Sequence, residues 1–436
     1  MIILLRDLLI GCCKKLDILR NDNKEYEVLI MGLLADRFRA QMAKSKDPRM
    51  EEAVADVMYP TGFLPFDFLN GYRVHVKSDN QDFWYNSVGI VDGSSTTIIG
   101  RSGSGKTTIA LQMAANIVRP FPEATIFYDD IEGGSNDTRR EMLTHFSPEE
   151  CQQRIIYRNT AVSAENFYKR IASIYDIKLN NRADFEYDTG KYDSYGNRIY
   201  KLIPTVYILD SLAMLTPEKL TEEEELSGQM STTATAKTNT AVFKRIIPKL
   251  KAANIILFVI NHINDKIEIN AFTHTKSQIG FLKQGETLPG GKAALYLANN
   301  MIRVDDGAKL KSNEGLGIDG KIVDFEIIKS RTNAAGRSVP MVFDFANGFD
   351  DILSLFMFLK STGAIVTGAT CYLRGHEDMK FRQKDFKNKL FTDPEFATVF
   401  NQVAKAELET LLGNPVEEET KFTQPNQAII NSILGL

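Results

Sequence analysis

The chain has 436 residues, 43% of them hydrophobic, and a formal net charge of −4 at pH 7. This length allows one large domain or two to three smaller ones with a sizeable packed core. The pI of about 5.9 excludes a uniformly basic nucleic-acid coat but allows a local basic patch. No apolar run reaches the roughly 20 residues that span a bilayer, so no membrane association is predicted. Four cysteines without metal-ligand spacing indicate a reducing, cytoplasmic location.

The first 58 residues form a predicted helical N-terminal segment. Apolar positions recur at helical spacing in LLRDLLIGCC and in EYEVLIMGLLADRF. The start of the chain lacks a basic leading segment, so we interpret it as a helix and not as a signal peptide.

A phosphate-binding loop between a strand and a helix is the strongest signal in the sequence. A β-branched run at 95–99 leads into GRSGSGKT, and apolar residues at helical spacing follow from Ile109. Glycines let backbone N–H groups surround phosphate oxygens, and the helix N-terminus adds partial positive charge. Lys106 can reach the β- and γ-phosphates of ATP, and Thr107 can ligate Mg²⁺. The predicted nucleotide-binding residues of this loop are Gly100, Arg101, Ser102, Gly103, Ser104, Gly105, Lys106, Thr107 and Thr108.

Two further predicted strands end in acids. TVYILD places Asp210 at the carboxyl end of a buried parallel strand, where α/β sheets bind ligands. We predict that Asp210 binds Mg²⁺ together with Thr107; the alternative is an ordinary helix cap. ATIFYDDIEGG offers Asp129, Asp130 and Glu132, and Glu132 is the preferred water-activating residue by its reach and spacing. Which of the three acids activates water stays open.

IILFVINH predicts another buried strand, whose polar end, Asn261 and His262, can hydrogen-bond phosphate or the attacking water. A long stretch with weak periodicity follows from Asn264 to Gly291. Loops of that length in a compact domain are usually functional or disordered. Its mixture of lysines and phenylalanines suits a groove for single-stranded nucleic acid. The predicted DNA-binding lysines are Lys276, Lys283 and, just beyond the loop, Lys292.

The chain after residue 367 becomes polar and basic, in RGHEDMKFRQKDFKNKL, and its tail carries Glu417–Glu419. The basic stretch could collect duplex DNA, or it could be a solvated helix face. Before the Asp210 strand, KYDSYGNRIY predicts a hairpin around Gly196 and Asn197.

The order of these motifs resembles that of the RecA-type recombinases, and most of all the UvsX-type recombinases of tailed phages. The resemblance covers about Tyr59 to Val366. It begins at TGFLPFDFLNG, upstream of the phosphate loop, and includes ANIILFVINH, which ends in His as in the phage type. LPGGKAALY resembles the end of the second DNA-binding loop, with Gly290 and Gly291, and VDFEIIKSRTNAAGRSVPMVF resembles a later strand pair. The stretches 72–93 and 178–204 are longer than their counterparts in the family. These insertions could be interaction surfaces or merely tolerated loops.

The resemblance implies a RecA-like P-loop ATPase core of α/β class at 59–366, with a mostly parallel central sheet and a small C-terminal region at 367–436. Glu132 would activate water, and His262 would couple the γ-phosphate to the second DNA loop. Lys329 and Arg331 would reach the nucleotide of the neighbouring subunit. The first DNA loop would lie within 216–240, and Lys244 is close to a DNA-contact position of the family.

The implied function is that of a DNA-dependent ATPase and recombinase that forms helical filaments on single-stranded DNA and promotes strand exchange with duplex DNA. ATP and Mg²⁺ would bind between adjacent subunits, and the N-terminal segment would dock on the next subunit or form an independent helix pair. Partners could include single-strand-binding or mediator proteins, in the cytoplasm of a host cell. The alternatives are a hexameric helicase of the DnaB type and an ATP-gated DNA-binding scaffold with little turnover.

Overall fold

The computed structural model of the chain describes residues 54–78, 80–222, 228–265, 282–290 and 293–412. The chain divides into two compact units, Met1–Ala55 and Asp56–Leu436, and nearly all described residues belong to the second. The N-terminal segment predicted at 1–58 lies almost entirely outside the described residues and stays a prediction. None of the described helices is long and apolar enough to cross a membrane.

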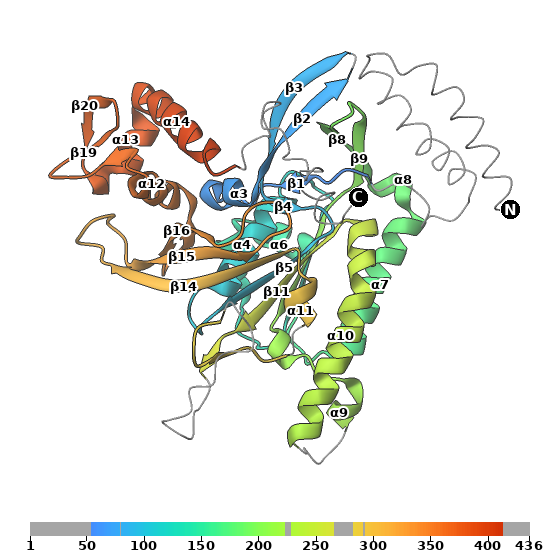
Figure 1. The fold of residues 1–436 in the computed structure, drawn as a ribbon. Coiled ribbons are helices and arrows are strands. Elements are labelled where there is room, and N and C mark those ends of the chain that lie inside the picture. Colours follow the sequence, from blue (N-terminus) through green and yellow to red (C-terminus); the bar gives the residue numbers. More distant parts are fainter. Residues whose placement is uncertain (1–53, 79, 223–227, 266–281, 291–292, 413–436) are drawn as a thin grey trace, which may run out of the picture. The chain divides into compact units, whose positions relative to one another are not determined.

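A nine-stranded sheet forms the centre of the second unit (Figure 1). In spatial order its strands are β17 (Gly348–Asp350), β16 (Arg337–Asp344), β15 (Gly320–Lys329), β14 (Asn300–Leu310), β5 (Ser95–Gly100), β11 (Ile255–His262), β10 (Thr205–Asp210), β6 (Ile126–Asp130) and β7 (Ile155–Arg158). The strands from β14 to β7 are parallel, and β15, β16 and β17 continue the sheet antiparallel. The predicted α/β class with a mostly parallel central sheet is confirmed.

Both faces of the central strands β10 and β11 are buried, which explains their nearly continuous apolar sequences. Three helices cover the two faces: α4 (Lys106–Val118) on one, and α7 (Ala164–Asn180) and α10 (Gly228–Ala253), side by side in Figure 1, on the other. Val206 of β10 belongs to the hydrophobic cluster that includes α4. The next residue, Tyr207, belongs to the cluster that includes α7 and α10. Three helices therefore hold the sheet from two sides.

The strand register brings the predicted site residues to one edge of the sheet. Asp210 lies opposite Asp130 on one side and opposite Ile260 on the other. His262 lies opposite Gly100, where the phosphate loop begins. The carboxyl ends of β6, β10, β11 and β5 thus meet at one place, as expected for parallel strands with buried faces.

Short elements connect the sheet to its helices. They are β1 (Met58–Tyr59), α3 (Leu64–Asn70), β4 (Ile90–Val91), α5 (Asp137–Thr144), α6 (Pro148–Arg154), α8 (Arg182–Phe185), η2 (Leu212–Met214), α9 (Glu218–Glu222), β12 (Asn264–Asp265), β13 (Glu286–Thr287), α11 (Ala293–Leu297) and α12 (Asp351–Ser361). The span 216–240, predicted to contain the first DNA loop, is largely helical in its described part, because α9 and the first turns of α10 lie within it.

The two insertions in the resemblance form hairpins that contact each other. The hairpins are β2 (Tyr72–Ser78) with β3 (Gln81–Ser87), and β8 (Glu186–Tyr192) with β9 (Arg198–Leu202). The Tyr85 hydroxyl donates to the Tyr192 carbonyl over 2.8 Å, and the Lys77 amide donates to the Ser194 carbonyl over 3.1 Å. The hairpin predicted around Gly196 and Asn197 is confirmed. Distant stretches of sequence therefore build one composite arm (Figure 1).

The described C-terminal residues pack on α12 through aromatic side chains. Their elements are β18 (Ile365–Val366), β19 (Cys371–Leu373), β20 (His376–Phe381), η3 (Gln383–Asp385), α13 (Phe386–Thr392) and α14 (Pro394–Glu409). Phe386 lies 4.8 Å from Phe356 of α12 between ring centroids. Part of the basic stretch is paired within the chain, since Lys387 contacts Asp350 and Arg374 contacts Glu407. The duplex-DNA interpretation of this stretch stays a prediction.

Candidate functional site

The phosphate loop lies between β5 and α4, as predicted. Gly105 has a φ of +96° and directly precedes the helix, in a backbone conformation that side chains disfavour. No side chain caps the N-terminus of α4 within the described residues. Its first N–H groups are therefore available to an anion, and the helix dipole favours negative charge there.

Lys106 and Thr107 face the end of β10 from the start of α4. The Thr107 hydroxyl donates to Asp210 Oδ2 over 2.6 Å. Burial raises the pKa of Asp210 to about 7, and the Thr107 hydrogen bond opposes this shift. Burial also lowers the pKa of the Lys106 ammonium to about 8, against the attraction of nearby carboxylates. Two buried groups of opposite sign are thus held in a site that disfavours charge until a ligand compensates it.

Residues at this edge fit a magnesium-bound nucleotide. Asp210 Oδ1 and Ser104 Oγ are buried and have no hydrogen-bond partner among the described residues. Unpaired buried oxygens of this kind are rare, because each costs free energy that a ligand or water can recover. Thr107 and Asp210 offer only oxygen ligands, which Mg²⁺ prefers. A cation beside Asp210 would stabilise its carboxylate, and a phosphate would accept from the Ser104 hydroxyl.

Hydrogen bonding separates the three acids after β6. Asp129 is buried, receives the Arg170 guanidinium over 2.6 Å and bonds the Tyr207 hydroxyl. Asp130 is also buried and accepts from the Gly133 and Ser135 amides, each over 2.9 Å, so it stabilises the turn that follows. Both carboxylates are therefore occupied in supporting the fold.

Glu132 alone of the three faces the phosphate loop edge with an exposed side chain. Its Oε1 accepts from the Ser211 hydroxyl over 2.6 Å and lies 2.8 Å from His262 Nε2. Ligand atoms of Glu132, Asp210 and His262 lie within 4.8 Å of one another. Glu132 Oε1 and His262 Nε2 already bond each other directly, so this cluster forms without a metal ion. The geometry favours Glu132 as the water-activating acid.

The polar end of β11 also contacts the end of the long stretch 264–291, the predicted second DNA-binding loop, which is called the second loop below. The Asn261 amide donates to the Pro289 carbonyl over 2.9 Å, and the Asn239 amide donates to the Gly290 carbonyl over 3.1 Å. Both asparagines are buried. Gly290 has a φ of +82°, and a Cβ there would lie 2.9 Å from Leu212. The glycine is therefore required by both its backbone and its neighbour.

Other predicted residues lie apart from this cluster. Lys329 Nζ donates to the Leu295 and Tyr296 carbonyls, over 3.2 and 2.5 Å, at the end of α11. Arg331 is exposed. Burial, with Arg331 nearby, lowers the pKa of Lys329. Neither residue contacts the phosphate loop of its own chain in the described part of the structure.

The predicted DNA contacts are described only in part. Lys244 is exposed on α10, and Lys283 Nζ pairs with Asp305 over 2.9 Å. Lys276, Gly291 and Lys292 lie outside the described residues and stay predictions.

Sequence reasoning missed Ser211 and Asn239. Ser211 follows Asp210 directly, so its place at a strand end was a usable signal. Asn239 lies inside a helix among Thr and Ala residues, and no local pattern distinguishes it. Only the fold brings it to Gly290.

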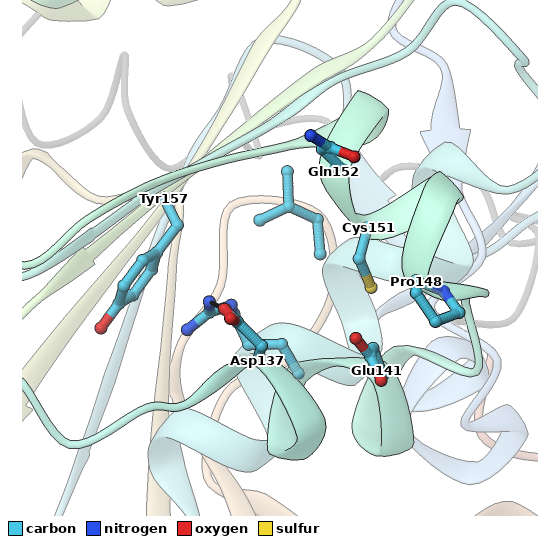
Figure 2. A pocket seen from close by; sticks show the side chains of 8 residues that line it. Asp137, Glu141, Pro148, Cys151, Gln152 and Tyr157 are labelled. Atoms are coloured by element: carbon cyan, nitrogen blue, oxygen red, sulfur yellow. Dashed lines mark hydrogen bonds and ion pairs between the residues drawn. The ribbon is translucent and has the colours of Figure 1, made fainter.

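A separate cavity of about 470 Å³ lies between α5, α6 and β7. Figure 2 shows its lining, which includes Asp137, Glu141, Cys151, Gln152 and Tyr157. Arg140 also lines it, with its guanidinium 3.7 Å from the Tyr157 ring centroid and in contact with Asp137. None of the predicted site residues reaches this cavity, and its charged groups are largely paired with one another.

No protein family and no curated protein matches the chain. Among solved structures, the chain is similar to that described as the crystal structure of the RadB recombinase. The similarity covers 60% of this chain and 92% of that one, at 18% identity and a TM-score of 0.36. The α/β fold class follows from the strand order and the phosphate loop, and not from this similarity.

Proposed function

We propose that this chain is an ATP-dependent DNA recombinase, which forms helical filaments on single-stranded DNA and promotes homologous pairing and strand exchange. The position of His262 carries the proposal. Its ring bonds Glu132 beside the phosphate loop, and the chain continues from it through β12 into the loop with the predicted DNA-binding lysines. One strand end therefore joins a hydrolytic site to a loop suited to single-stranded nucleic acid.

The residues of the site divide the chemistry of ATP hydrolysis among them. Lys106 and the N-terminus of α4 would hold the phosphates, and Thr107 with Asp210 would hold Mg²⁺. Bound Mg²⁺ supplies charge neutralisation at the phosphates. Glu132 would orient or deprotonate the attacking water, since Ser211 and His262 hold its carboxylate in one place.

A neighbouring subunit would complete the site. Lys329 and Arg331 belong to the proposed function as cations that act on the nucleotide of the next subunit. Neither contacts the phosphate loop of its own chain among the described residues, and Arg331 is exposed, which supports this assignment. A cation from a neighbour acts mostly on charge that develops in the transition state.

Two motifs that favour a recombinase over a DnaB-type helicase contact each other. The Thr332 hydroxyl donates to the Asn70 carbonyl over 2.9 Å, and the Asn333 amide donates to the Gly71 carbonyl over 2.6 Å. The stretch KSRTN is therefore held against the end of TGFLPFDFLNG. The residues on both sides of Arg331 are therefore bonded to the earlier motif.

ATP hydrolysis and electron microscopy test the proposal together. We expect single-stranded DNA to stimulate hydrolysis, and a slowly hydrolysed ATP analogue with single-stranded DNA to give helical filaments. Closed rings would indicate the helicase, and DNA binding without turnover would indicate the scaffold. Strand exchange between a single strand and a homologous duplex is the decisive assay, and its absence in the presence of filaments would contradict the proposal.

A further inference from the structure

Arg101, the second residue of the phosphate loop, makes a contact that the proposed chemistry does not use. Its guanidinium donates two hydrogen bonds to Asp265, over 2.8 and 2.7 Å. Asp265 is the last residue described before the segment 266–281, so the pair joins the phosphate loop to the start of the second loop. The Arg101 and Asp265 side chains are 54% and 69% exposed, so the pair can open without disturbing the core.

The same guanidinium approaches the other end of that loop. Asp265 pairs with Glu286 in the short ladder between β12 and β13, which closes the base of the loop. Arg101 lies 4.0 Å from Glu286, measured between Nη2 and Oε1. Glu286 is buried and accepts two hydrogen bonds from Arg303, which is also buried. Arg101 therefore sits at the base of the loop, against a fixed buried ion pair.

Arg303 extends this contact to a predicted DNA-binding residue. Its Nε donates to Asp305 over 2.8 Å, and Asp305 also receives Lys283 Nζ over 2.9 Å. Charges of alternating sign thus run from Asp265 through Arg101, Glu286, Arg303 and Asp305 to Lys283. One end of this row, Asp265, directly precedes the segment 266–281, and the other end, Lys283, lies two residues after it.

The backbone of Arg101 faces the nucleotide side. Lys106 Nζ donates to the Arg101 carbonyl over 2.7 Å. An ammonium has three N–H donors, so Lys106 can keep this bond while it turns to a phosphate oxygen, but the turn changes the direction of the bond. Arg101 is thus the residue whose carbonyl is bonded by Lys106 and whose side chain holds the loop base.

We propose that Arg101 is a positioning residue that transmits nucleotide occupancy of the phosphate loop to the base of the second loop, by a path separate from His262. The turn of Lys106 toward phosphate moves the Arg101 carbonyl bonded to it, and with it the guanidinium relative to Asp265 and Glu286. The β12–β13 base then changes its spacing, and Lys283 becomes available to DNA phosphate. This inference rests on the proposed function for its DNA step, but its first step concerns nucleotide and protein alone.

The test compares DNA affinity in two nucleotide states. The coupling ratio is the affinity for single-stranded DNA with a slowly hydrolysed ATP analogue, divided by the affinity with ADP. We expect Arg101→Ala and Asp265→Ala each to lower this ratio at least threefold. The double variant should lose no more than either single variant, because both remove the same contact. The charge exchange Arg101→Asp with Asp265→Arg should recover at least half of the loss on a logarithmic scale.

A matched control uses the hairpin pair Arg198–Asp188, whose side chains are 41% and 38% exposed. Arg198→Ala should leave the ratio unchanged, since this pair is remote from the phosphate loop in the sequence and in its contacts. If Arg101→Ala loses nucleotide binding altogether, Asp265→Ala decides the question with an intact loop. An unchanged ratio in Asp265→Ala, with normal coupling in the wild type, overturns the inference and leaves the proposed function standing.

Hydrogen exchange without DNA tests the role of Arg101 separately from the proposed recombinase function. The inference predicts that the ATP analogue with Mg²⁺ changes amide protection at 263–265 and 282–287 in the wild type and that Arg101→Ala loses this change. A wild type without DNA coupling would contradict the proposed function, yet this exchange result would still support the inference. No nucleotide-dependent change at these amides, or the same change in Arg101→Ala, overturns it.

Discussion

Asp129, Asp130 and Glu132 lie within one short stretch, and burial separates their chemistry. The first two are buried and hydrogen-bonded within the fold, whereas Glu132 reaches the phosphate loop edge. A carboxylate whose oxygens are already occupied by the fold cannot also take a proton from water at low cost. At the scale of residues, hydrogen bonds therefore favour Glu132 as the candidate for water activation more than spacing does.

Glu132→Gln should keep ATP binding and slow hydrolysis by about 10²-fold or more, as expected when a general base is lost. Single-turnover hydrolysis with saturating ATP measures the loss. Asp130→Asn is the matched control: it should lower stability through the turn at Gly133 while retaining most of the hydrolysis rate per folded molecule. A crippled Asp130→Asn beside an active Glu132→Gln would reverse the assignment.

The raised pKa of Asp210, about 7, predicts a pH-dependent Mg²⁺ requirement. Below pH 7 the carboxyl group is protonated in the free protein, and Mg²⁺ must displace that proton. Mg²⁺-dependent nucleotide affinity should therefore fall by about tenfold per pH unit below 7, since one pKa unit corresponds to about 1.36 kcal/mol. Isothermal titration of Mg²⁺–nucleotide between pH 5.5 and 8, values chosen to span the pKa by about one unit or more, checks this slope.

The same shift has a definite sign for the stability of the nucleotide-free protein. A carboxyl group with a raised folded-state pKa contributes most below its ordinary pKa, and that contribution is lost as pH rises through about 7. Burial raises the pKa of Asp67 to about 7 as well, so both groups act in the same direction. Asp210→Asn should flatten the decline in unfolding free energy between pH 4 and 7, measured by urea denaturation at each pH. The same decline with pH in the variant and the wild type would contradict the raised pKa.

At the scale of elements, the last residues of β11 connect the proposed nucleotide site to the start of the predicted DNA-binding loop. Asn261 holds the Pro289 carbonyl, His262 holds Glu132, and β12 follows directly. β11 pairs with β5, and His262 lies opposite Gly100, so this end of β11 lies beside the phosphate loop. The end of the second loop returns to that edge, held by two buried asparagines.

Gly290→Ala should destabilise the returning end of the second loop. The left-handed conformation costs about 1–2 kcal/mol for a side chain, and the contact with Leu212 adds to it. Urea denaturation should show this loss, with weaker single-stranded DNA binding. Gly363→Ala is the control, since its φ of +75° is similar but no atom lies within 4 Å of its Cβ. It should lose stability alone, and equal DNA binding by the two variants would argue against a role of this anchor.

At the scale of the whole molecule, the described residues include the proposed nucleotide site and two cations, Lys329 and Arg331, that do not contact it. Lys329 is the last residue of β15 and Arg331 follows it, on the side of the sheet beyond β14 and β5. A head-to-tail assembly would supply these cations from the next subunit, because heterologous contacts repeat without closing unless the rotation forms a ring.

Mixing Arg331→Ala protein with Lys106→Ala protein should restore hydrolysis that neither variant has alone. At equal amounts, about a quarter of head-to-tail interfaces combine an intact phosphate loop with an intact cation. DNA-stimulated hydrolysis of the mixture, at constant total protein, measures the recovery. Absence of recovery at every ratio would show that the site is complete within one subunit.

The sequence by itself determined the strands and the phosphate loop, because these are local properties. Apolar runs such as IILFVINH bury on both faces, and the glycine spacing of GRSGSGKT admits phosphate whatever surrounds it. Asp210, Glu132 and His262 could be named from their places at strand ends. Their meeting at one edge follows from parallel pairing, which the motif order already indicated.

Only the tertiary structure decided which of these groups contact one another. Asn239 reaches Gly290, Arg101 reaches Asp265, and the two hairpins at 72–87 and 186–202 join, through contacts between residues far apart in the sequence. Likewise, Asp129 and Asp130 look as reactive as Glu132 until Tyr207, Arg170 and the Gly133 amide are placed around them. Local patterns set what each residue can do, but burial and hydrogen-bond partners are long-range quantities that exist only once the chain has folded.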